Sequence, residues 1–576
     1  MNLRFPDVLH PSANDFELCE TLVTRSKIDD VMEMAARSAN PTTGPERTNP
    51  YTARAVVMAL MLVVAGRGTI SLANMLATLW HLTADQLQRV GMTGYISPER
   101  LSALALNHDQ YVAEYQLLRA KFNELIATID SSPHPRQRRE PNSVRWARVS
   151  NLTAEQKRVL DTKEQRFVEV IDLVTKASLI GARPDHWKGH VAIDETLIES
   201  FANKKGCGTK MNEMGVADAD GSWYKDKKSG EWKIYHKVVA AIPAISPYGI
   251  DMENLTIGLH VRKPHTGDNA AAALAAILAS WRTGFRPEPK SSPFAIGDQA
   301  YTKNADLFLL SMAKWGYRVI ADARQKVTKH EIRLESGHRV VAGQLVCPAG
   351  DHLSHQPLGW PPDEQVVGAF AVAERADVID EIARYAAPTN GRPTLVESGP
   401  HKGEVAIRVA CPAMAGQVRC PLMADSLAQP DTVPFATNAP KTDHWPACKS
   451  ANTTAYLKVK QTKHLDSLIR GSYLHADWYN FNRSRNEKTF SQLKSVTQGG
   501  LDGNRIHLMG RARVGLAVTL ALAIQNVRIL EEWKRREEYA TRKHLVHASP
   551  RFRHTPREAR RKARAKILKE YRATHR

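Results

Sequence analysis

Three acidic residues, far apart in the chain, stand in sequence contexts that suit ligands of a divalent metal ion. Asp194 lies in HVAIDET and Asp298 in PFAIGDQAY, each at the end of an apolar run typical of a strand. Glu487 lies in NRSRNEKTFSQLK, a helical pattern with basic residues on both sides. Two strand-end carboxylates and one helical carboxylate can converge on a pair of Mg²⁺ ions, because hard cations prefer oxygen ligands. Asp194 would bridge both ions, and Asp298 and Glu487 would hold one each.

A pair of such ions can cleave a phosphodiester bond. One ion activates the attacking oxygen and the other stabilises the leaving oxygen when they lie roughly 3.5–4 Å apart. Arg483 precedes Glu487 by four residues and Lys494 follows it by seven, so all three are expected on one helix face. A carboxylate between two cations suits the grip of a scissile phosphate. Each acid alone has a plainer explanation as a cap, turn or surface ion-pair residue, and only the combination favours a metal-dependent nuclease site.

Charge and composition agree with that chemistry. The chain has 576 residues, with 80 Lys and Arg against 60 Asp and Glu and a net charge of +20. A basic balance of this size favours a polyanionic partner. The longest apolar runs, Ala55–Ala65 and Val514–Ile524, fall well short of the ~20 residues that span a bilayer, so we expect buried helices and no membrane partner. The amino terminus lacks a signal-peptide pattern and six cysteines make no disulfide framework, which predicts a cytoplasmic protein.

Residues 1–130 are predicted to be helical, with one helix opening at Asn49-Pro50 and continuing to Val64. Short helices broken by glycine suit a helix-turn-helix DNA-binding domain, and a plain helical bundle fits the pattern equally well. Residues 131–185 are predicted to form a basic linker and a connecting helix. The linker would either touch phosphates or be a solvated connection.

From residue 186 to 324 the pattern alternates between strands and helices. The predicted strands are His190–Ile198, Trp232–Ile245, Leu255–Val261, Phe294–Ile296 and Tyr317–Ala321, and the predicted helices are Asp268–Trp281 and Ala305–Trp315. The order β-β-β-α-β-α-β is that of an RNase H-like core, an α/β fold with a mixed sheet flanked by helices. Asp194 and Asp298 would then meet at the edge where strand ends form sites. Glu195 would alternate to the opposite strand face.

The remaining chain completes this core. Residues 325–465 are predicted to be a β-rich insertion, because a structureless loop of that length is improbable inside a compact fold. Residues 466–538 would be the second part of the core with the Glu487 helix. Residues 539–576 form a basic tail, expected either to bind DNA or to remain solvated.

Four cysteines fall in the insertion, namely Cys347, Cys411, Cys420 and Cys448. Four thiolates can make a tetrahedral Zn²⁺ site. No CxxC pair is present and the spacings are loose, which favours buried free thiols over zinc. The chain has no P-loop, so no nucleotide cofactor is expected.

At these motifs the chain resembles the DDE transposases of bacterial insertion sequences. IDET resembles their first aspartate motif, GDQAYTKN the second, and NRSRNEKTFSQLK the Tyr-x2-Arg-x3-Glu-x6-Lys signature of one branch. Arg483, Glu487 and Lys494 match the last three signature positions, whereas the tyrosine position is Asn480, with Tyr479 one residue early. The resemblance covers about residues 186–530.

The resemblance implies residue roles. Asp194, Asp298 and Glu487 would be the catalytic metal ligands. Arg483 and Lys494 would contact DNA at the transposon end. A β-rich insertion ahead of the Glu487 helix is also implied.

We therefore expect a transposase that cleaves and joins double-stranded DNA at the element's ends and at its target. It would act as a homodimer on DNA with two Mg²⁺ or Mn²⁺ ions, in the bacterial cytoplasm and associated with the nucleoid. The alternatives are an RNase H-like nuclease without transposition and a non-catalytic DNA-binding protein derived from a transposase. Intact acids count against the last, and the insertion and basic flanks count against a minimal nuclease.

Overall fold

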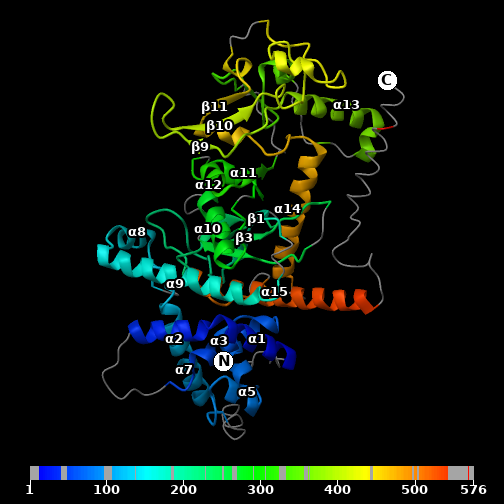
Figure 1. The fold of residues 1–576 in the computed structure, drawn as a ribbon. Helices are drawn as coiled ribbons and strands as arrows, with labels where there is room; N and C mark the ends of the chain where they lie inside the picture. The colour runs from blue at the N-terminus through cyan, green and yellow to red at the C-terminus, as the bar shows by residue number, and fades with distance from the viewer. Residues whose placement is uncertain are drawn as a thin grey trace.

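The chain has a mixed α/β fold in which helices flank a six-stranded mixed sheet (Figure 1). The computed structural model describes residues 12–39, 49–96, 107–135, 138–182, 187–226, 229–248, 252–262, 269–289, 291–304, 306–322, 332–355, 361, 364–441, 445–495, 499–501, 505–542 and 569. Apart from Lys569 and residues 539–542, the predicted basic tail lies outside the described residues.

Strand β1 lies in the middle of the sheet, antiparallel to β3 and parallel to β5. The sheet order is β2–β3–β1–β5–β6, with β4 also paired to β3 and β6 parallel to β5. The strands are β1 (Val191–Glu199), β2 (Ser222–Lys225), β3 (Trp232–Pro243), β4 (Gly258–Arg262), β5 (Phe294–Gly297) and β6 (Arg318–Ala321). The predicted strands are all present with shifted ends, and β2 was not predicted.

Helices cover both faces of this sheet. Helix α10 (Asn269–Arg282) packs its alanines on one face, against alternate residues of β1 and β3 such as Ile193 and Val239. Helix α14 (Tyr473–Lys494) lies on the other face, against Ala192 and its neighbours. Helix α12 (Phe308–Trp315) connects β5 to β6. The first residues of the two predicted connecting helices, Asp268 and Ala305, lie outside the described residues.

The amino-terminal helices share one apolar core with the sheet. They are α1 (Ala13–Ser26), α2 (Ile28–Ala39), α3 (Ala53–Ala65), α4 (Leu72–Trp80), α5 (Ala84–Arg89) and α7 (His108–Ala127). Two long helices, α9 (Ala154–Ser178) and α15 (Arg511–Arg542), lie between them and the sheet (Figure 1). One continuous buried cluster runs from α1 and α3 through α9 and α15 to Val238 and Ala240 of β3.

Helix α3 is strongly apolar, and every residue of it except Arg54 is buried. Its start is fixed by Thr52, whose side chain accepts a hydrogen bond from the Ala55 amide, so the helix begins three residues after the predicted opening at Asn49-Pro50. Within the described residues one stretch, Arg511–Arg536 of α15, is long and apolar enough to cross a membrane. Of its apolar 18-residue window, 67% is buried inside the fold, as for a core helix.

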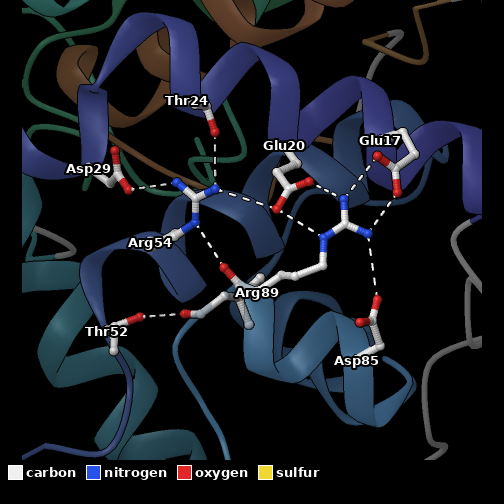
Figure 2. A network of polar contacts seen from close by, with 9 residues as sticks. Glu17, Glu20, Thr24, Asp29, Thr52, Arg54, Asp85 and Arg89 are labelled. Atoms are coloured by element: carbon white, nitrogen blue, oxygen red, sulfur yellow. Dashed lines mark hydrogen bonds and ion pairs between the residues drawn. The ribbon is translucent and has the colours of Figure 1, made fainter.

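Two arginines tie the amino-terminal helices together (Figure 2). Arg89, at the end of α5, forms ion pairs with Glu17 and Glu20 of α1. Arg54 of α3 pairs with Asp29 of α2 at 3.3 Å and donates to the Arg89 carbonyl at 3.0 Å. Both guanidinium groups are therefore committed to internal partners.

Part of the predicted basic linker is folded as helix α8 (Asn142–Ser150). Arg145 is buried and donates to the carbonyl of Val216, while Arg148 pairs with Glu140 at 2.6 Å. Arg145 therefore anchors this segment to the loop before β2, whereas Arg148 forms its ion pair within the segment.

The insertion between β6 and α14 contains two small sheets and one long helix. The strands are β7 (Arg339–Val341), β8 (Gln344–Val346), β9 (Thr394–Leu395), β10 (Glu404–Ala410) and β11 (Asn452–Lys458). Helix α13 (Glu364–Tyr385) was missed by the β-rich prediction. Its buried side chains include Ile382 and Tyr385, which fix it to the small core of the insertion.

Candidate functional site

Asp194 and Asp298 project from neighbouring strands toward helix α14. Asp194 shares its face of β1 with Ala192, and Asp298 directly follows β5, in phase with Ile296; both apolar residues pack against α14. The two aspartates line one narrow cavity together with three residues of α14, namely Tyr479, Arg483 and Asn486. The cavity holds about 10 Å³, which is room for one ion or water.

Helix α14 is fixed over this cavity by side-chain amides. Buried Asn482 accepts from the Ile245 amide at 2.9 Å and donates to the Ile245 carbonyl at 3.0 Å. Asn254 donates to the Arg485 carbonyl at 2.9 Å, and Arg485 donates to the Met252 carbonyl at 3.1 Å. The chain after β3 is thus bound to α14 in the turns that precede Glu487.

Burial dominates the electrostatics of Asp194. It raises the pKa of this carboxyl to about 6, and the nearby Glu195 and Asp298 carboxylates add to the rise. The backbone amide of Glu195, which donates to Asp194 at 2.8 Å, and the Arg483 guanidinium oppose it. Asp298 caps the short helix α11 (Gln299–Thr302) and accepts from the Ala300 amide at 3.1 Å. Both carboxylates are held by backbone donors and keep oxygens for another partner.

Glu487 is connected to the site only by its ion pair with Arg483. The Arg483 guanidinium donates to Glu487 at 2.8 Å and to the Tyr479 hydroxyl at 2.8 Å. Burial works against its charge, yet Tyr479, Glu487 and Asp194 together raise the pKa of Arg483 above its usual value. The Glu487 side chain is 57% exposed and lies outside the cavity lining. Among the described residues, no three His, Cys, Asp or Glu side chains are gathered at metal-binding spacing.

The fifth predicted site residue lies at the end of the helix. Lys494 is partly buried in the last turn of α14. It is seven residues beyond Glu487, or about 10 Å along the helix axis. The structure thus brings Asp194, Asp298 and Arg483 together, places Glu487 beside Arg483, and leaves Lys494 at a distance.

Two residues of the cavity escaped the sequence prediction. Asn486 is 1% exposed, and its side-chain oxygen has no hydrogen-bond partner in the part of the chain described here. Tyr479 supplies the hydroxyl that meets Arg483. Both belong to the buried stripe of α14 with Asn482, and their spacing of three and four residues was the available signal.

The donor set fits a hard divalent cation. Two aspartates and the unpartnered oxygen of Asn486 offer oxygen ligands around one ion-sized space, as Mg²⁺ or Mn²⁺ requires. A second ion would need the Glu487 carboxylate, which the Arg483 ion pair holds outside the cavity.

The residue next to Asp194 points to the other face of the sheet, as predicted. Glu195 forms an ion pair with Lys237 of β3 at 2.6 Å. On that side Tyr301 is buried, and a Cβ atom added to Gly297 would lie 2.8 Å from its ring. Glycine at position 297 therefore allows Tyr301 to pack directly behind the aspartates.

No family model and no curated protein matches the chain.

Removing the Asn482 amide should loosen α14. Asn482→Ala leaves the buried Ile245 amide and carbonyl unpaired, which we expect to lower the free energy of unfolding by about 2–4 kcal/mol. Asn480→Ala, on the outer side of the same turn, should change it by less than about 0.5 kcal/mol. Urea unfolding of both variants measures the difference. Equal losses would show that the amide does not fix the helix.

The raised pKa of Asp194 predicts that Asp194→Asn increases the stability of the fold in a pH-dependent way. The folded chain keeps this proton up to about pH 6, whereas the unfolded chain releases it near its ordinary value of 3.8, so ionised Asp194 destabilises the folded state above pH 6. In metal-free buffer the asparagine variant should be more stable at pH 7 by about 1–3 kcal/mol, and no more stable at pH 4. Thermal unfolding at both pH values tests this. A variant that is less stable at pH 7 would contradict it.

Proposed function

We propose that this chain is a DDE transposase that cuts and joins double-stranded DNA at the ends of an insertion sequence. One observation carries the proposal: aspartates from adjacent parallel strands line a single ion-sized cavity beneath the helix that bears Glu487 and Arg483. The sheet supports it, since β1, β3 and β4 are antiparallel and β5 and β6 follow as parallel strands, as in an RNase H-like core, with β2 as an additional strand. The net charge of +20 suits a DNA partner.

The residues of the site would act in distinct ways. Asp194, Asp298 and the Asn486 oxygen would hold a divalent ion, which when bound supplies an activated water and charge neutralisation at the phosphate. Arg483 would exchange the Glu487 carboxylate for a DNA phosphate oxygen, because a guanidinium binds both anions with the same paired geometry. That exchange would free Glu487 to turn toward the aspartates and complete the ligand set.

Cleavage of a labelled duplex that carries the element's own ends tests the proposal. With Mg²⁺ or Mn²⁺ the unaltered protein should cut at the ends and transfer them to a second duplex. Asp194→Ala, Asp298→Ala and Glu487→Gln should each abolish cutting and retain DNA binding, because binding depends on many phosphate contacts. Glu155→Gln, at an exposed ion pair on α9, is the matched control and should cut normally.

The same assay separates the alternatives. Undiminished cutting by Asp298→Ala would refute the assigned site. Cutting of any duplex without strand transfer would indicate a nuclease. Binding to the ends without cutting in either metal would indicate a non-catalytic DNA-binding protein.

The role of Arg483 gives a second prediction. Arg483→Ala should lower the cleavage rate at the ends by roughly 10²-fold, since one charged donor to the reacting phosphate is lost. Affinity for random duplex should change little. Lys488→Ala, which removes an exposed cation one residue from Glu487, should cut at the normal rate. Equal effects of the two substitutions on cleavage would show that Arg483 contributes only general charge.

A further inference from the structure

Four cysteines of the insertion converge on one small cavity, although they come from four separate segments. Cys347 follows β8, and Cys411 follows β10. Cys420 precedes the short helix η3 (Ala424–Ala428), and Cys448 ends the short helix η4 (Pro446–Cys448). All four line the same cavity of about 20 Å³. This space holds one ion and is too small for an iron–sulfur cluster.

Two of these cysteines begin tight turns at the cavity wall. The Gly350 amide donates to the Cys347 carbonyl at 2.9 Å, and the Met423 amide donates to the Cys420 carbonyl at 3.0 Å. Each turn therefore fixes the backbone of its cysteine beside the cavity.

The first loop depends on a glycine. A Cβ atom added to Gly350 would lie 2.4 Å from Val346 and 2.7 Å from Tyr385, so no side chain fits there without displacing the packed core. The Cys347 amide is itself held by the Tyr385 carbonyl at 2.9 Å. The loop is thus fixed against the end of helix α13, with Cys347 in the wall of the cavity.

The surroundings of the four sulfurs are apolar. Cys347, Cys420 and Cys448 are each at most 9% exposed, and Cys411 is half-buried. Ala413, Val418 and Leu422 complete the wall. Burial raises the pKa of the Cys347 thiol, and the neighbouring Cys411 and Cys420 add to the rise. Packing alone does not explain why four sulfur atoms converge here, because four small apolar residues would fill the same space.

We propose that Cys347, Cys411, Cys420 and Cys448 form a structural site for one tetrahedrally bound Zn²⁺ ion. Four thiolates are the ligand set of closed structural zinc sites. Among the described residues no three donors lie at ligand spacing, so the four sulfur atoms would have to come closer together to bind the ion. The site is independent of the proposed DNA chemistry.

Zinc here would join the ends of β8 and β10 to the loops that carry η3 and η4, which share one small apolar cluster. Because binding energy at such a site is folding energy, loss of the ion should unfold the insertion while the main sheet persists.

Metal analysis of the full chain tests the site. Protein produced with zinc in the medium should carry one zinc ion per chain and no iron. Cys347→Ser and Cys420→Ser should lose that ion. Cys207→Ser, a partly exposed cysteine outside the insertion, is the matched control and should retain it.

Chelation covers the case in which the serine variants fail to fold. A strong zinc chelator added to the unaltered protein should increase amide hydrogen exchange in β10 and β11 and leave β1 and β3 protected, and added zinc should reverse the change. The proposal would be overturned if the protein bound no zinc after exposure to it, or if Cys347→Ser retained zinc. Bound iron with labile sulfide, or a disulfide among the four cysteines, would also overturn it.

Discussion

A side-chain amide decides where the helix of the candidate site lies. Asn482 binds both backbone groups of Ile245, a residue 237 positions earlier in the chain, and so acts as one more strand partner for the end of β3. Asn526 repeats the arrangement between α15 and Thr256, with hydrogen bonds of 2.9 Å to its amide and carbonyl. A buried backbone group that loses such a hydrogen bond lowers the free energy of unfolding. Each of the two helices therefore has a single stable position against the sheet.

The insertion makes the hydrogen bonds of Asn482 necessary. It separates β6 from α14 in the sequence, so chain connectivity alone cannot place α14 over the aspartates. A second buried contact lies between the end of β6 and the start of α14. The Asp466 carboxylate accepts from the Ala321 amide at 3.3 Å at the end of β6 and meets His475 in the first turn of α14. The two halves of the site are thus held in register by polar groups at the start and in the middle of α14.

Local sequence patterns predicted the elements that carry the acids, because a strand or helix is encoded over a few neighbouring residues. β1, β5 and α14 lie where apolar runs and helical spacing placed them. The roles of Asn482 and Asn486 were not predictable, since each depends on a partner from a distant segment or on a cavity that only folding creates. The four cysteines show the same limit. Their sequence intervals of 64, 9 and 28 residues suggest no site, yet they meet at one point.

The continuous core below the sheet has a mechanical consequence. Residues of α1, α3, α9 and α15 are buried in the same apolar cluster as Val238 and Ala240 of β3. A region joined to its neighbour through a shared interior cannot swing on a hinge, unlike a domain tethered by a flexible linker. The amino-terminal helices therefore hold a constant distance and angle to Asp194 and Asp298. A ligand bound by those helices would therefore lie at a distance from the two aspartates that the fold keeps constant.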